Sequence, residues 1–334
     1  MYTPLSDLLA DLSGTDVTRI RLISMFVVLL AGLTSGYFAA NRLPLHQKSA
    51  KKIMTLVLVC FNWPIALLVI WNAHLTAQFI WLPIAGLILM LTSTAISAAL
   101  FSFFKLDPTS RLTLILAGGL SNVGYTGGAF VCYALFGMTG LALANIYLLL
   151  VLPTFYLIYL PLLKVREMRT QNRRTKLRLN FLLDSRMLAI PAIITAIILN
   201  LTNVKQPALI AELHIIDIFV YIASSLSFFA IGLQVKLSRL KNYMTLYFPL
   251  AAVKFILTPA VALLLITLLA LAGQSLEGLV QNVIMVLAAT PSAVLMVTMS
   301  NVFDLDGPLA SALWVVTTAV FVLIVVPVLF LTFT

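Results

Sequence analysis

The chain alternates between long apolar runs and short polar or charged stretches. Asp, Glu, Lys and Arg are absent from residues 53–104, from the stretch between Arg111 and Lys164, and from residues 278–303 and 307–334. One membrane-crossing helix needs only about 20 apolar residues. The pattern therefore predicts ten transmembrane helices, with approximate bounds at 20–40, 53–71, 79–103, 112–136, 140–163, 187–203, 215–235, 245–272, 278–301 and 308–333.

Composition agrees with this pattern. Of the 334 residues, 62% are hydrophobic and 10% are charged, which is more apolar surface than one soluble core can bury. We therefore predict an all-α polytopic membrane protein that is surrounded by a lipid bilayer. The formal net charge of +10 is concentrated in the predicted loops, so it does not indicate a nucleic-acid partner.

The positions of Lys and Arg predict the orientation. The loops after predicted helices one, three, five, seven and nine carry 4, 2, 8, 3 and 0 of these residues, or 17 of 21. Because cytoplasmic loops are enriched in Lys and Arg, we expect residues 42 and 170 in the cytoplasm. Residues 5, 74 and 334, and with them both termini, are expected outside. Residues 1–13 lack the features of a signal peptide and are predicted to form a short amphipathic surface helix.

Neither metal nor cofactor chemistry is indicated. Cys60 and Cys132 lie inside apolar runs, where cysteine usually acts as a small buried hydrophobe. His46, His74 and His214 lie near predicted helix ends without the spacing of metal ligands. The sequence has no Walker-type Gly-x-x-x-x-Gly-Lys-Ser/Thr stretch, which argues against ATP-driven pumping by this chain. We therefore predict no cofactor and no bound metal.

The longest predicted loop divides the chain into two halves. Residues 1–163 hold five helices, residues 164–186 form a basic cytoplasmic connector, and residues 187–334 hold five more. Because each half has an odd number of helices, the second half enters the membrane from the opposite side, and the two repeats are inverted. The fourth helix of each half, which is helix four or nine of the chain, is interrupted near its middle, at 121–128 and at 289–292.

These two interruptions predict a substrate site. Irregular backbone at membrane depth is tolerated where it meets protein or a water-filled cavity, and matched broken helices indicate where a substrate binds. A half-helix that starts after a break directs N–H groups and the positive end of its dipole into the cavity, which favours an anion. The candidate substrate-binding residues at the breaks are Asn122, Gly124, Tyr125, Thr126, Gly127, Gly128, Thr290, Pro291 and Ser292.

Three more polar residues at membrane depth complete the candidate set: Asn62, Asn145 and Lys254. Lys254 falls about ten residues into helix eight, near mid-bilayer, where an ammonium group is costly unless it meets water, a partner or a substrate. It either attracts an anion or exchanges a proton, or its side chain extends to the cytoplasmic surface. Asn62 and Asn145 line the cavity or form hydrogen bonds between helices, which is the commoner role for a single amide.

The motifs at the two breaks resemble those of the auxin efflux carrier family, which includes plant PIN proteins and bacterial permeases and belongs to the bile/auxin transporter superfamily. SNVGYTGGAF (Ser121–Phe130) resembles the family's Asn-x-Gly-x-x-Gly segment, and AATPSAV (Ala288–Val294) resembles its second Pro-Ser-Ala motif. The resemblance implies two inverted five-helix repeats with helices four and nine crossing at the centre. It also implies transport of organic anions such as auxin or small dicarboxylates, with Asn122 contacting the carboxylate.

The chain departs from the family pattern at three places. The proline expected after the second motif glycine is replaced by Ala129, and a proline expected in helix seven is replaced by Ser225. Leu152-Pro153 stands where helix five of the family usually has an asparagine. Gly127-Gly128 can still interrupt helix four. We therefore expect the architecture to be kept, whereas the substrate does not follow from named relatives.

The predicted function is secondary active transport and not an enzymatic activity. We expect a permease that moves small organic anions or carboxylates across the inner or plasma membrane by alternating access, with a proton or sodium ion as coupling ion and a homodimer as an open option. The alternative within transport is a sodium-coupled symporter of the bile-acid type, with Asn122, Thr126 and Ser292 among its ligands. The alternative outside transport is an intramembrane enzyme built on a Ser292–Lys254 dyad.

Overall fold

The regular structure of the protein is almost entirely helical. The computed structural model describes residues 14–42, 47–171, 188–234 and 237–333. Within these ranges the regular structure outside helices is one isolated antiparallel bridge between Ser121 and Ser292. The all-α prediction is therefore confirmed for the described part of the chain. The predicted surface helix at 1–13, His46 and residues 172–186 of the basic connector lie outside the described residues.

Seven helical stretches are long and apolar enough to cross a membrane. They are Asp16–Ala40, Lys52–Trp71, Ala77–Ser102, Gly128–Arg166, Ile215–Gly232, Leu240–Leu271 and Gly307–Phe333. Two shorter apolar helices, Ala189–Leu201 and Gly278–Ala288, accompany them. The chain is therefore a multi-pass integral membrane protein, as the hydropathy pattern predicts.

The helices of the first half follow the predicted segments with one exception. They are α2 (Gly14–Arg42), α3 (Gln47–Val57), α4 (Trp63–Trp71), α5 (Trp81–Ser102), α6 (Pro108–Gly119), α7 (Gly128–Thr154) and α8 (Leu160–Gln171). Predicted helix four is interrupted between α6 and α7, as expected. The exception is that α7 continues into predicted helix five. Gly137, with φ 64° and ψ −148°, bends the chain between the two parts, in a backbone region that a residue with a Cβ rarely adopts.

The second half repeats the feature of an interrupted helix. Its helices are α9 (Ala189–Leu201), α10 (Ala208–Glu212), α11 (Ile215–Gly232), α12 (Met244–Ala252), α13 (Thr258–Leu271), α14 (Gly278–Ala288), α15 (Val294–Val302), α16 (Gly307–Val320) and α17 (Val326–Phe333). Predicted helix nine is divided into α14 and α15 by the segment 289–293, which contains Pro291. Both expected interruptions are therefore present.

Four spans contain a π-helical turn that the hydropathy pattern does not predict. These turns are η1 (Leu58–Asn62), η3 (Phe155–Tyr159), η7 (Val253–Leu257) and η8 (Phe321–Val325). A π-turn accommodates an extra residue and is often found at functional sites. Two of the candidate residues, Asn62 and Lys254, lie in such turns.

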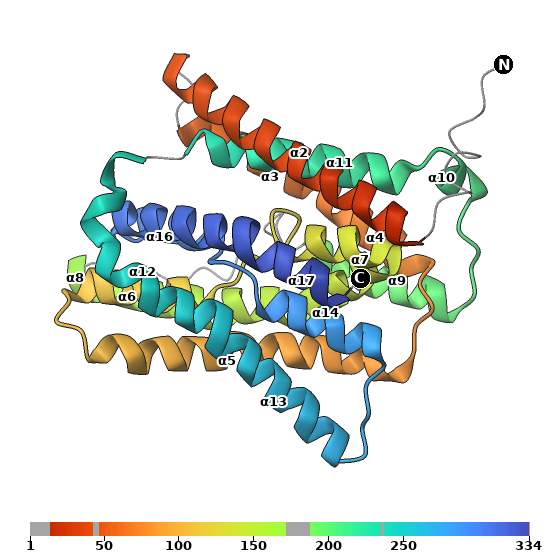
Figure 1. Ribbon diagram of the computed structural model, residues 1–334. Coiled ribbons are helices and arrows are strands. Elements are labelled where there is room, and N and C mark those ends of the chain that lie inside the picture. Colours follow the sequence, from red (N-terminus) through yellow and green to blue (C-terminus); the bar gives the residue numbers. More distant parts are fainter. Residues whose placement is uncertain (1–13, 43–46, 172–187, 235–236, 334) are drawn as a thin grey trace.

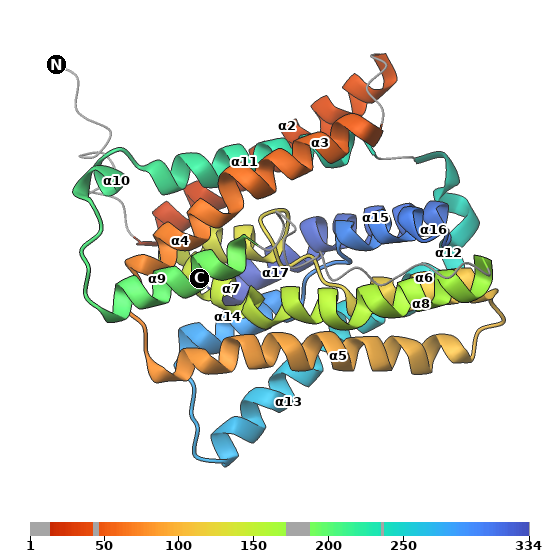
Figure 2. The ribbon, with the colours of Figure 1, turned by 180° about the vertical axis from the view of Figure 1, so that it is seen from behind.

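The helices form two bodies (Figures 1 and 2). Helix α11 packs on α2 and α3, and α4 packs on α9 and α11; we call this set the α2–α11 layer. Gly36 and Gly232 permit the closest approach in this layer, since a Cβ on either would lie within 2.3 Å of a backbone oxygen of the opposite helix. Helices α5 to α8 and α12 to α17 form the other body, which we call the crossing bundle.

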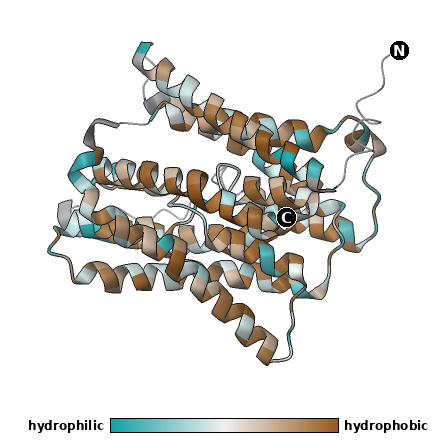
Figure 3. Ribbon diagram, in the orientation of Figure 1, coloured by the Kyte–Doolittle hydropathy of each residue, from teal (hydrophilic) through white to brown (hydrophobic). Residues whose placement is uncertain are grey.

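Polar residues gather at the ends of the helices, whereas their lengths are mostly hydrophobic (Figure 3). One end of the protein holds the ends of α2, α5 and α8 and the starts of α3, α6 and α16 (left in Figure 1). We call it the basic end, because Arg42, Lys105 and Lys164 belong to it. Here Asp306 accepts a hydrogen bond from the Ser110 hydroxyl at 2.8 Å and so joins the starts of α6 and α16.

Candidate functional site at the helix crossing

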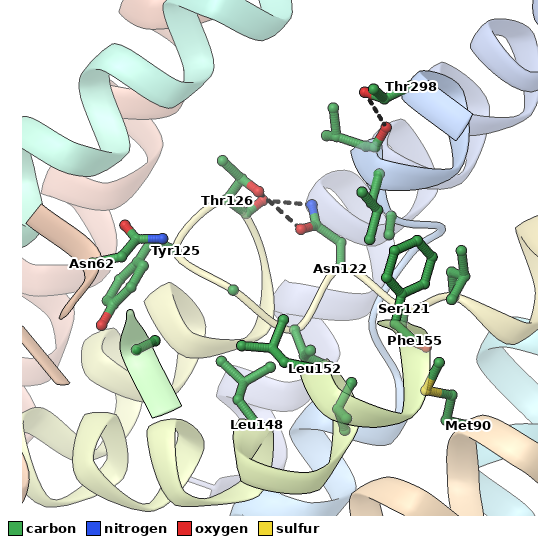
Figure 4. Close-up of a pocket in the computed structure, with 18 of the residues that line it drawn as sticks. Asn62, Met90, Ser121, Asn122, Tyr125, Thr126, Leu148, Leu152, Phe155 and Thr298 are labelled. Atoms are coloured by element: carbon green, nitrogen blue, oxygen red, sulfur yellow. Dashed lines mark hydrogen bonds between the residues drawn. The ribbon is translucent and has the colours of Figure 1, made fainter. Parts of the chain in front are cut away.

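The first break, Leu120–Gly127, is a loop closed by Asn122. The side-chain nitrogen of Asn122 donates to the carbonyl oxygen of Thr126 at 3.0 Å, and the Thr126 hydroxyl donates to the Asn122 amide oxygen at 2.8 Å (Figure 4). The carbonyl oxygen of Asn122 accepts a further bond from the Gly128 N–H at 2.8 Å. A primary amide has two donor hydrogens, so Asn122 retains one for a ligand while it holds the loop together.

The first N–H groups of α7 are used inside the same loop. The Gly127 N–H donates to the Gly124 carbonyl at 3.0 Å, and the Ala129 N–H donates to the Val123 carbonyl at 3.0 Å. From the sequence these donors are expected to face a cavity, but those of Gly127, Gly128 and Ala129 are already satisfied inside the loop. Ala129 stands where the family pattern has a proline, and its N–H makes a bond that proline, lacking that hydrogen, cannot make.

The second break is joined to the first by main-chain hydrogen bonds. The Asn122 N–H donates to the Pro291 carbonyl at 2.8 Å, and the Ala293 N–H donates to the Leu120 carbonyl at 2.9 Å. These bonds flank the antiparallel bridge between Ser121 and Ser292. Because each break supplies the partners that the other lacks, unpaired backbone groups are satisfied at membrane depth. We call this arrangement the joint.

A cavity of about 450 Å³ adjoins the joint, between the α2–α11 layer and the crossing bundle. Apolar side chains form much of its wall, including Met90, Leu148, Leu152 and Phe155 (Figure 4). The polar part of the wall consists of amides and hydroxyls. Among the described residues that line the cavity there is no Asp, Glu, His, Lys or Arg.

Half of the predicted site residues line this cavity. Those in the wall are Asn62, Asn122, Gly124, Tyr125, Thr126 and Asn145. Those outside the wall are Gly127, Gly128, Thr290, Pro291, Ser292 and Lys254. The residues of the second group lie outside the cavity wall and contribute hydrogen bonds around the joint. For example, the Ser292 hydroxyl donates to the Ala117 carbonyl at 2.8 Å, and the Thr290 hydroxyl donates to the Leu287 carbonyl at 2.8 Å.

The first turn of α15 reaches the cavity, whereas the first turn of α7 does not. Ala293, Val294 and Leu295 line the cavity, and the structure gives the N–H groups of Val294 and Leu295 no acceptor among the described residues. Free N–H groups and the positive end of the helix dipole favour an anion at such a position. These two residues are not predicted from the sequence because their side chains are apolar. The signal was Pro291, since a half-helix must begin shortly after it.

Lys254 lies behind the wall of the cavity and is fully buried by protein. Its ammonium group donates to the Ser121 hydroxyl oxygen at 2.5 Å and lies 3.4 Å from the Gly118 carbonyl oxygen. Its side chain therefore does not extend to the cytoplasmic surface. Helices α5, α6, α12 and α13 contain no Asp or Glu, and no carboxylate of a described residue pairs with Lys254. Ser121, which lines the cavity, connects this charge to it.

A comparison with protein families decides the class. The family described as "Membrane transport protein" matches residues 21–329 of the chain. The chain belongs to this family. The match confirms the resemblance to the auxin efflux carrier family and, with the apolar helices, makes this protein a membrane transporter. A comparison with curated proteins found no match.

Tyr125 ties the loop of the transporter to two other helices. Its hydroxyl donates to the Asn145 amide oxygen at 2.9 Å, and its carbonyl oxygen accepts from the Ser224 hydroxyl of α11 at 3.2 Å. Asn62 lies beside Tyr125 in the wall (Figure 4), and its buried side-chain oxygen has no hydrogen-bond partner among the described residues. Asn62 therefore keeps an unused, enclosed acceptor next to the cavity wall.

The structure does not form the dyad that an intramembrane enzyme would need. Lys254 donates to Ser121, whereas the Ser292 hydroxyl donates to the Ala117 carbonyl oxygen. Over the described residues, no group of three or more His, Cys, Asp or Glu side chains is placed to hold a metal ion. The wall of the cavity, with amides and hydroxyls at the joint and apolar side chains elsewhere, is suited to binding a ligand.

Proposed function

We propose that this protein is a secondary active transporter that moves small organic anions or carboxylates across the cell membrane by alternating access. The observation that carries the proposal is the first turn of α15, whose residues line the cavity at the joint and whose Val294 and Leu295 N–H groups have no acceptor among the described residues. An anion there meets the positive end of a half-helix, as in other helix N-terminal anion sites.

Electrostatics supports an anion as the substrate. Lys254 places a positive charge one hydroxyl group away from the cavity, and no acidic side chain among the described lining residues opposes it. Because charges interact strongly where water is excluded, Lys254 in its protonated form would make the potential at the joint positive. Asn122 and Ser121 add neutral donors beside it. Leu148, Leu152 and Phe155 suit an apolar body attached to the anionic group.

We propose further that the transporter crosses the membrane ten times, as two inverted repeats within residues 1–163 and 187–334. The two interrupted helices support this, because their parts have similar lengths. Before the breaks, α6 has 12 residues and α14 has 11. After them, α15 has 9 residues, and α7 runs from Gly128 to the bend at Gly137. Inverted repeats with matched broken helices are typical of secondary transporters.

The proposed orientation places the basic end in the cytoplasm and both termini outside. The Lys and Arg residues of the odd-numbered loops support it, because cytoplasmic loops are enriched in these residues. The position of the cavity between the α2–α11 layer and the crossing bundle supports alternating access. A relative movement of the two bodies would expose the site to one side at a time.

A proline substitution at Val294 tests the anion site without removing a side-chain charge. Proline is tolerated in the first turn of a helix, and the preceding Ala293 already has the extended backbone (φ −72°, ψ 143°) that proline requires. Val294→Pro therefore deletes one N–H donor and keeps the helix. Val294→Ala is the matched control, because it trims the side chain and keeps the N–H.

Binding of benzoate, phenylacetate and succinate is measured by thermal shift in detergent, each beside its uncharged amide. We expect one or more of the acids to bind more tightly than its amide. Val294→Pro should lower the affinity for that acid by roughly ten- to 150-fold, which corresponds to the loss of one hydrogen bond to a charged group. Equal binding of every acid and its amide would contradict the proposal. Repeating the titrations with sodium or potassium chloride separates sodium coupling from proton coupling.

A further inference from the structure

The cavity lies on one side of the joint. Its lining residues in the span of α3 and η1 lie between Met54 and Asn62, and a further one, Gln234, follows the end of α11. Asn301 lines it from the last turn of α15. These positions extend toward the basic end. Among the described lining residues, none comes from α2 or from the first nine positions of α7, 128–136. The other side of the joint, where Phe130 and Tyr133 are buried, lies outside this cavity, and we call it the closed side.

Tyr133 is at the centre of this closed side. It lies in α7 beyond the joint, has 2% of its surface exposed, and donates its hydroxyl to Asp217 in the first turn of α11. The guanidinium carbon of Arg21, in α2, lies 5.6 Å from the centre of the Tyr133 ring. His214 lies 3.6 Å from the second oxygen of Asp217. One tyrosine of the crossing bundle thus contacts an anion and a cation of the α2–α11 layer.

The surrounding contacts also connect the two bodies. The ring of Tyr221, in α11, packs edge-on against Phe130 at 6.2 Å and against Tyr133 at 6.0 Å. Arg21 reaches the bend of α7 as well, since a Cβ on Gly137 would lie 2.7 Å from its Nη1. Elsewhere in this region, the bond between Ser24 and Tyr221, 2.6 Å long, links α2 to α11 and stays within the layer.

We infer that Arg21, Tyr133 and Asp217 form a latch that closes the transport pathway on the side away from the basic end. The latch joins α7 of the crossing bundle to both main helices of the α2–α11 layer. A movement of the bundle that opens this side must separate Tyr133 from both charged partners. The inference rests on the proposed alternating access, and it assigns to this cluster the closing of one gate. In a carrier with two conformations, a few interactions can shift the ratio of the closed and open states of this side. A cluster of three residues is therefore large enough to favour the closed state.

Two tyrosine variants distinguish the effect of the latch from that of the neighbouring contacts. Tyr133→Phe deletes the hydroxyl that crosses between the bodies, whereas Tyr221→Phe deletes a neighbouring hydroxyl that bonds within the layer. Both keep their rings and therefore the aromatic packing. The reporter is a single cysteine at Gly124, a cavity residue where an added Cβ meets nothing within 4 Å, in a chain lacking Cys60 and Cys132.

The rate of labelling by a membrane-impermeant maleimide is measured in intact cells and in inside-out vesicles. With both tyrosines present, we expect Gly124→Cys to react from one side only. Tyr133→Phe should increase the rate from the other side by about tenfold, which corresponds to the loss of one hydrogen bond to a charged group. Tyr221→Phe should leave it unchanged. Unchanged labelling from the accessible side shows that each variant is folded.

Two results would overturn the latch. One is equal labelling of Gly124→Cys from both sides before either tyrosine is changed. The other is a Tyr133→Phe variant that behaves like Tyr221→Phe. If either result appears while carboxylates still bind the protein, the latch is wrong and the proposed transport function stands. If carboxylates do not bind in preference to their amides and Tyr133→Phe still opens the second side, the substrate proposal fails and the latch stands.

Discussion

Replacing Lys254 by Met should abolish most of the preference for anions. The ammonium group lies 2.5 Å from the Ser121 hydroxyl oxygen, and that hydroxyl can donate onward into the cavity. A carboxylate accepting this bond lies about 5 Å from the charge. At an effective dielectric constant of about 20, two unit charges at that distance interact by about 3 kcal/mol. Lys254→Met should therefore lower the affinity for a carboxylate by roughly 150-fold.

The same substitution should not destabilise the fold. A fully buried ammonium group with no carboxylate partner among the described residues is costly, and Met has a similar length without the charge. We expect the melting temperature of Lys254→Met to equal or exceed that of the parent protein. The assay is the ratio of the dissociation constants of each acid and its amide, measured on purified protein. Two variants serve as controls. Lys254→Arg keeps the positive charge, and Lys105→Met removes a positive charge from an exposed loop position.

Two outcomes would refute this reasoning. The first is an unchanged acid-to-amide ratio in Lys254→Met, which would mean that the charge does not act on the cavity. The second is an unfolded Lys254→Met beside a stable Lys254→Arg, which would make the residue structural. Lys105→Met should leave both the ratio and the melting temperature unchanged, because it is exposed and far from the joint.

Other substitutions test the joint, the bend and the orientation. A Cβ on Gly127 would lie 2.1 Å from a carbonyl oxygen of its own loop, so Gly127→Val should lower the unfolding free energy by about 1–3 kcal/mol, whereas Gly124→Ala should be silent in thermal melts. Gly137→Ala forces a Cβ into a positive-φ position and should cost about 1–2 kcal/mol in the same assay. Impermeant maleimide applied to intact cells should label His74→Cys and not Lys105→Cys; the reverse result would invert the proposed orientation.

The sequence predicts the interrupted helices well because the signals for them are local. Paired glycines at 127 and 128 and a proline at 291 weaken a helix wherever they occur, and the structure has both breaks there. These predictions need no knowledge of which helices are neighbours.

The sequence does not reveal which hydrogen bonds satisfy the backbone groups at the two helix breaks. The bonds of Asn122 to Thr126 depend on a loop shape that no single-residue preference specifies. The N–H groups of Val294 and Leu295 belong to the main chain, so their residue types give no indication of a site. The role of Tyr133 was missed for another reason. Its partners, Arg21 and Asp217, are far away in the sequence, and each reads as an ordinary charge at a membrane surface.

The joint has a consequence for how such a chain can diverge. Its two connecting bonds run from the N–H groups of residues 122 and 293 to main-chain oxygens, so they demand no particular side chain there except that neither residue be proline. Side chains around the joint can therefore be replaced as substrates change, while the two halves of the protein remain fastened together. Selection can alter what the cavity recognises without having to rebuild the crossing that creates it.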